Sequence, residues 1–134
     1  AIIGILAAVA YPSYRQHVLT SNRLEAKSSL MELSQLQENF YVENNRYASN
    51  LDSLDAGQAG FEKKGSAFIS KNGRLDLVSG YYELKLLGVN TTYTLTAIAL
   101  DPQTDDKSCI KFTIDNAGRK RAEDSDEQNN DKCW

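Results

Sequence analysis

The sequence predicts an α+β fold in which one long N-terminal helix packs on a four-stranded antiparallel sheet. Three observations support it. The first 45 residues keep a helical spacing of apolar side chains, segments rich in β-branched and aromatic residues follow from residue 81, and two cysteines stand near the C-terminus. Because the strands follow the helix and do not alternate with helices, we expect a meander and not a parallel sheet.

The size and charge of the chain set limits on its class. A length of 134 residues favours one domain, and 41% hydrophobic and 25% charged residues are ordinary values for a folded domain. The net charge of -3 gives the whole molecule no attraction to nucleic acid or to an anionic membrane. Residues 1–50 carry four basic and four acidic side chains, so the net negative charge belongs to the remainder. We expect a neutral helix and an acidic head.

The predicted helix covers residues 1–45 and ends near Asn44 and Asn45, since asparagine tolerates left-handed geometry. Pro12 removes one backbone donor and should kink the helix. Such a helix is about 65 Å long, more than the diameter of a small domain, so its front half needs partners outside the chain. Apolar side chains recur along one stripe of this helix, and its members Leu30, Leu33, Leu36 and Phe40 are expected to pack against the sheet. The other members of the stripe are Tyr14, Val18 and Ala26.

The first ten residues contain no polar side chain. They cover about 15 Å, which is half of the hydrocarbon core of a bilayer. Neither an initiator methionine nor a basic segment precedes them, so we expect that residues upstream have been removed. An ordinary buried helix of a globular protein is the alternative.

Residues 46–80 are predicted to form an irregular connector, and residues 81–122 a β-meander. The link at residues 88–92 suits a hairpin, and residues 115–118 suit a turn. The connector should be anchored by Tyr47, Leu51, Leu54, Phe61 and Phe68. The four predicted strands are residues 81–87, 93–100, 109–114 and 119–122.

Cys109 and Cys133 are the two cysteines, and they have no CxxC spacing. One pair cannot form a tetrahedral zinc site, and the single histidine, His17, lies far away in the sequence. We therefore expect a structural disulfide that closes the loop 109–133 in an oxidising compartment. The chain-entropy model gives about 3.5 kcal/mol for such a loop.

Several segments resemble type IV pilins. These are AIIGILAAVAYPSYRQHV at 1–18, NNRYASNLDSL at 44–54, YTLTAIAL at 93–100, FTIDNAG at 112–118 and the Cys-Trp ending at 133–134. The resemblance is to the PilE-like branch, whose members are often minor pilins, and it implies the type IV pilin fold. In that family a prepilin-peptidase site, a methylated phenylalanine and a glutamate in the first turn precede this segment, so no residue here takes those roles.

The resemblance implies a subunit with two parts, a protruding helix at residues 1–18 and a head at residues 19–134, and we expect residues 1–18 to contact no part of their own head. The helix would cross the bacterial inner membrane once, with the head in the periplasm, until the assembly machinery moves the subunit into an extracellular filament. There it would pack against the helices of other subunits, supporting pilus biogenesis, twitching motility, adhesion or DNA uptake. The implied membrane and filament-core residues are Ala1, Ile2, Ile3, Gly4, Ile5, Leu6, Ala7, Ala8, Val9, Ala10 and Pro12.

No catalytic motif or cofactor site is recognised in the sequence, so an enzyme is not expected. Acidic side chains in residues 123–131 could hold calcium, as in type II secretion pseudopilins, which are an alternative class for this chain. Their spacing lacks the glycine and the register of an EF-hand, so a solvated acidic loop is the favoured interpretation. Trp134 is expected to pack over the disulfide, with a surface adhesive contact as the alternative.

Arg119, Lys120 and Arg121 form one basic cluster. Closely spaced cations neutralise phosphates, and some pilins that resemble this chain are DNA-uptake receptors, so one interpretation is a DNA contact. The other is an edge strand whose charges discourage aggregation. Acidic neighbours such as Glu123 and Asp124 oppose the approach of phosphate.

Overall fold

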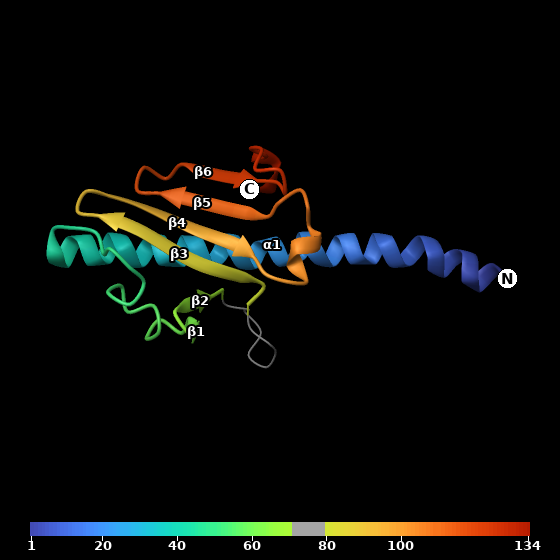
Figure 1. Cartoon of the computed structure of the whole chain (residues 1–134), viewed down its shortest axis with the longest axis horizontal. Helices are drawn as coiled ribbons and strands as arrows, with labels where there is room; N and C mark the ends of the chain where they lie inside the picture. Colours follow the sequence, from blue (N-terminus) through green and yellow to red (C-terminus); the bar gives the residue numbers. More distant parts are fainter. Residues whose placement is uncertain (71–79) are drawn as a thin grey trace.

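The computed structural model describes residues 1–70 and 80–134 and shows one helix lying across one face of an antiparallel sheet (Figure 1). The helix α1 is Ile2–Asn44, and the sheet has six strands in the order β1-β2-β3-β4-β5-β6. The strands are β1 (Glu62–Lys64), β2 (Ala67–Ile69), β3 (Tyr82–Val89), β4 (Thr92–Ala99), β5 (Lys111–Asp115) and β6 (Lys120–Glu123). Two 3₁₀ turns complete the described fold, η1 (Gln103–Asp105) and η2 (Asp131–Cys133).

The prediction of a four-stranded sheet was wrong, because β1 and β2 extend it to six strands. Both lie in the predicted connector, whose residues 71–79 lie outside the described part. Each has three residues, and all three side chains of β1 are exposed, so no alternation of apolar and polar residues marks it. Gly65, with φ of 63°, supplies the left-handed residue of the turn between them.

The helix ends as predicted. Asn45 is left-handed, with φ of 55° and ψ of 26°, and its N–H donates to the carbonyl of Tyr41. The helix continues through Pro12 and bends towards its N-terminal end, which extends beyond the sheet (Figure 1). The N-terminal part of the helix therefore lies outside the layered head.

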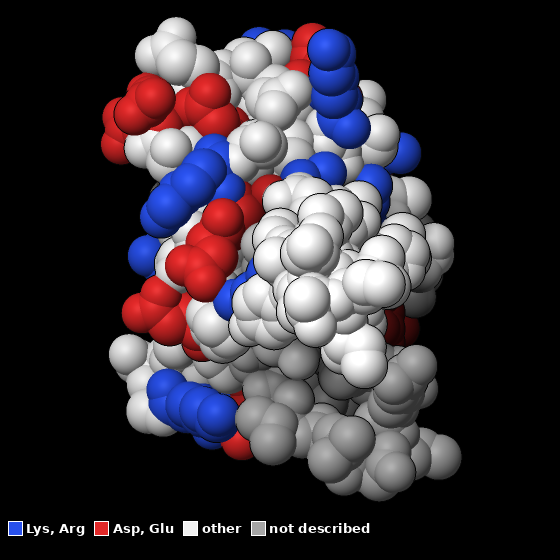
Figure 2. All heavy atoms as spheres, turned by 90° about the vertical axis from the view of Figure 1, so that its right-hand side faces the viewer, with Lys and Arg blue, Asp and Glu red and all other residues white. Residues whose placement is uncertain are grey.

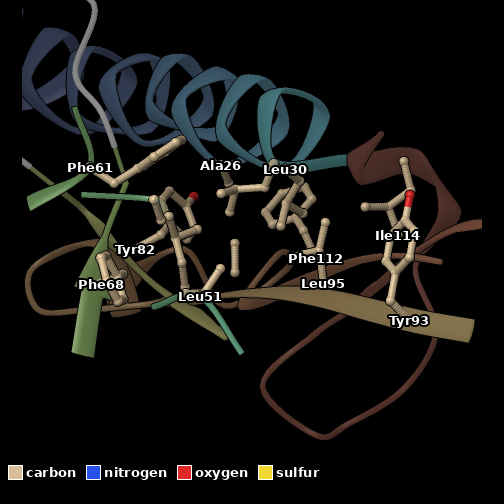
Figure 3. Close-up of a cluster of buried hydrophobic side chains, with 14 of the residues drawn as sticks. Ala26, Leu30, Leu51, Phe61, Phe68, Tyr82, Tyr93, Leu95, Phe112 and Ile114 are labelled. Carbon is tan, nitrogen blue, oxygen red and sulfur yellow. The ribbon is translucent and has the colours of Figure 1, made fainter. Parts of the chain in front are cut away.

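The hydrophobic core lies between the C-terminal half of α1 and one face of the sheet (Figure 3). Leu30 and Leu33 are fully buried, and Leu36 and Phe40 pack at the border of the core, so the four residues predicted to pack against the sheet do so. On the sheet side, the rings of Tyr82 and Phe112 meet edge to face at 5.8 Å. Four of the predicted connector anchors, Leu51, Leu54, Phe61 and Phe68, are buried, and Tyr47 packs against the core partly buried.

The β3–β4 hairpin is tighter than the sequence suggested. Val89 pairs with Thr92, which leaves residues 90–91 as the turn where a five-residue link was expected. Gly88 lies inside β3, because a Cβ there would come within 2.1 Å of the carbonyl oxygen of Ala48. The connector after α1 can therefore cross β3 only at a glycine.

The predicted Cys109–Cys133 disulfide is formed. The bridge ties the C-terminal segment to the chain just before β5, and the Asn130 N–H of this segment donates to the Ala122 carbonyl of β6 at 2.8 Å. The indole N–H of Trp134 donates to the Arg121 carbonyl at 2.6 Å, and its ring packs edge to face on Phe112 at 5.7 Å. The C-terminus thus covers an edge strand that would otherwise offer free carbonyls to another chain.

Candidate functional site

The N-terminal part of α1 is an exposed apolar surface. Its large aliphatic side chains, Ile2, Ile3, Ile5, Leu6 and Val9, are between 64% and 84% exposed. Figure 2 shows the molecule from this end, with the uncharged helix projecting in front of a head on which basic and acidic side chains are mixed. A contiguous apolar surface of this kind marks a site of interaction with protein or lipid.

Within the described residues, no helix carries an apolar stretch long enough to cross a membrane.

A network of polar contacts holds α1 where it leaves the head. The Arg23 guanidinium donates to both carboxylate oxygens of Asp106, at 2.6 and 2.8 Å, and the Asp106 side chain is 1% exposed. The hydrogen bond from Arg23 to Asp106 raises the pKa of Arg23. Buried Gln103 donates from its amide to the carbonyl of Leu19 and to the hydroxyl of Tyr82. The loop between β4 and β5 therefore fixes the position of the helix.

Arg15 adds an exposed contact to this network, pairing with Asp105 at 2.8 Å. We expected no contact between residues 1–18 and the head, so Arg15 is an exception to that expectation. The division at residue 18 stays a prediction.

Glu25 connects α1 to the residues that follow β2 and precede β3. Its Oε1 accepts from the Ser70 hydroxyl at 2.5 Å and from the Tyr81 N–H at 3.1 Å. Burial raises the pKa of Glu25 above the ordinary glutamate value, and these hydrogen bonds oppose the shift. The Glu25 carboxyl group therefore stays protonated to a higher pH in the folded chain than in the unfolded chain. Its contribution to the stability of the fold is lost as the pH rises through the raised pKa.

The structure separates the basic cluster of the sequence. Arg119 pairs with Asp115 at 2.8 Å. The Lys120 ammonium lies 5.4 Å from the centre of the Trp134 ring, on the helix side of the sheet. Arg121 takes the opposite face by strand alternation, in register with Thr113. Arg121 and the ion-paired Arg119 therefore lie towards the outer face and Lys120 towards the other, although all three line the hollow beside β6.

The outer face of the sheet, turned away from α1, carries a polar row that the sequence analysis missed. Lys85 pairs with Thr96, Thr96 with Thr113, and Thr113 with Arg121, so one residue from each of β3, β4, β5 and β6 lies in line. We call these four residues the Lys85–Arg121 row. The alternation of YYELKLL places Lys85 on the polar side of its strand, which was the available signal, but the partners depend on register.

The acidic C-terminal segment uses its carboxylates locally. Asp124 Oδ1 accepts from the N–H groups of Asp126 and Gln128, at 2.9 Å each. Over residues 1–70 and 80–134, the structure contains no group of three or more acidic, histidine or cysteine side chains that could hold a metal ion. A hollow of about 570 Å³ beside β6 mixes both signs of charge, and it is lined by Arg119, Lys120, Arg121, Glu123, Glu127, Asn129 and Asp131.

A long helix with an exposed apolar end, packed on an antiparallel sheet whose last segment is closed by a disulfide, defines a type IV pilin subunit. Residues 12–113 match the family described as "Type IV minor pilin ComP, DNA uptake sequence receptor", and the chain belongs to this family of minor pilins. No curated protein matches the chain. The resemblance seen in the sequence is confirmed, and the chain is a subunit of a type IV pilus.

Proposed function

We propose that residues 1–18 anchor this subunit in the inner membrane before assembly and enter the helical core of the extracellular filament afterwards. The head at residues 19–134 lies in the periplasm in the first state and on the filament surface in the second. The observation that carries the proposal is the exposed aliphatic surface of Ile2, Ile3, Ile5, Leu6 and Val9, which contrasts with the covered face of α1 further along.

One helical surface can serve both environments. The helix satisfies its own backbone hydrogen bonds in lipid, and the same side chains can bury against the helices of other pilins. Small residues between the aliphatic ones, such as Gly4, Ala7 and Ala8, allow close approach of helices. The role of the subunit is structural and not catalytic, supporting pilus biogenesis and through it twitching motility or adhesion, with the assembly machinery as a further partner.

The substitution Ala7→Asp tests this proposal. A carboxylate at this position is expected to disfavour the membrane state by about 2.5–3.5 kcal/mol on the insertion scale and to be unpaired among filament helices. Position 7 lies about 50 Å from Phe40 by helical rise, so the head should be unaffected. We expect the variant to be missing from sheared filaments while its head keeps the wild-type melting temperature.

Ala117→Asp is the matched control, because Ala117 is exposed in the turn between β5 and β6 of the head. This variant should assemble like the wild type. Normal incorporation of the Ala7→Asp subunit, together with normal pilus function, contradicts the proposed role of the helix.

We propose DNA binding by the head as a second function. The description of the family names a DNA uptake sequence receptor, and Lys85 and Arg121 are exposed to solvent on the outer face of the sheet. Binding of duplex DNA to the purified subunit, weakening as salt rises, is the expected result. An affinity below detection at low salt contradicts it.

A further inference from the structure

We propose that duplex DNA binds across the outer face of the sheet along the Lys85–Arg121 row, and not at the basic sequence cluster of residues 119–121. This inference rests on the DNA-binding part of the proposed function. It names the residues that contact the DNA backbone and the direction in which the duplex crosses the strands.

The register of the strands sets the geometry of the row. Lys85 and Arg121 are exposed and stand at its two ends, on β3 and β6. Three inter-strand steps of about 4.8 Å separate them, which places their Cα atoms roughly 14 Å apart. Thr96 and Thr113 lie between the two cations and are part-buried, with hydroxyl groups on the same face.

The charges near the row leave these two cations available. On the same face, Glu123 pairs with Lys111 at 2.7 Å and Asp115 pairs with Arg119 at 2.8 Å. No described carboxylate forms an ion pair with Lys85 or Arg121. Glu83, two residues before Lys85 on the same face, is the acidic side chain that opposes an anion here.

Duplex DNA fits this arrangement. The Cα atoms of Lys85 and Arg121 are separated by roughly 14 Å, which approaches the about 12 Å width of the major groove, and phosphates border that groove on both sides. The threonine hydroxyls can donate to phosphates or base edges in between. Because the chain as a whole has a net charge of -3, attraction to DNA must come from such a local arrangement.

The test uses the full chain in a neutral detergent and a labelled DNA duplex, with affinity measured at several salt concentrations. Two phosphate contacts should contribute about -2 to the slope of log affinity against log salt. Lys85→Gln and Arg121→Gln should each reduce the slope by about 1. The double variant should lose about tenfold in affinity at 50 mM salt, where these contacts are strongest.

Lys120→Gln is the matched control. It removes the same charge from the residue next to Arg121, but its side chain lies over Trp134 on the other face of the sheet. It should keep the wild-type slope, and all variants should keep the wild-type melting temperature.

The outcomes separate this inference from the function on which it rests. If the double variant binds duplex DNA as tightly as the wild type, the Lys85–Arg121 row is not the contact surface, although DNA binding itself stands. The same conclusion follows if Lys120→Gln loses as much affinity as Arg121→Gln. Failure of the wild type to bind the duplex overturns both.

Discussion

Replacing Asp106 with alanine is expected to destabilise the head by about 3–5 kcal/mol, because it leaves a mostly buried guanidinium without its partner. The Arg23 side chain is 15% exposed, and both of its contacts to Asp106 are shorter than 2.9 Å. The midpoint of urea unfolding of the full chain in detergent measures the effect. An unchanged slope of the unfolding free energy against urea would show that the loss is in stability alone.

The neighbouring pair provides the control. Arg15 also reaches from α1 to the β4–β5 loop, but Arg15 and Asp105 are 37% and 61% exposed, so Arg15→Ala should change stability by at most about 1 kcal/mol. Replacing both buried partners, as in Arg23→Met with Asp106→Leu, should recover much of the loss. If Asp106→Ala and Arg15→Ala lower the free energy of unfolding equally, the buried Arg23–Asp106 pair does not stabilise the head more than the exposed pair does.

Removing the disulfide is the second change with a large expected effect. Cys109 and Cys133 are each 1% exposed. The double variant Cys109→Ala with Cys133→Ala therefore removes the bridge and leaves apolar side chains at both buried positions. We expect a loss of about 2–5 kcal/mol in the free energy of unfolding, since the bridge constrains a loop with a sequence separation of 24.

Limited proteolysis locates this second effect. Cleavage should accelerate first in residues 124–134, although the bonds from Asn130 and Trp134 to β6 continue to hold part of that segment. Reduction of the wild-type protein should reproduce the change. Wild-type stability and wild-type cleavage in the double variant contradict a structural role for the bridge.

The helix could be predicted because its apolar spacing is a local pattern, and the disulfide because two cysteines allow only one pairing. Apolar spacing placed Leu30 and Leu33 inward, Asn45 marked the helix end, and the chain offers one pairing of its two cysteines. Strands β1 and β2 were missed because each has three residues and β1 has no buried side. Periodicity cannot be seen in so short a segment.

The contacts that hold the functional surfaces could not be predicted from local patterns. Arg23 and Asp106 are 83 residues apart, and no sequence signal pairs them. Likewise, Lys85 and Arg121 share a row only because three pairs of strands have the observed register. A shift of one residue in any of these pairs would turn one of the two side chains to the opposite face.

The most direct test of the central claim places a photoreactive amino acid at Leu6, which is 64% exposed on the protruding helix. Cross-linking is carried out in intact filaments and on isolated subunits in detergent, and the products are mapped by mass spectrometry. We expect cross-links to the N-terminal helices of neighbouring pilins in filaments and none between subunits in detergent. Cross-links from position 6 to the strands of its own head in filaments would contradict the proposed assembly through this helix.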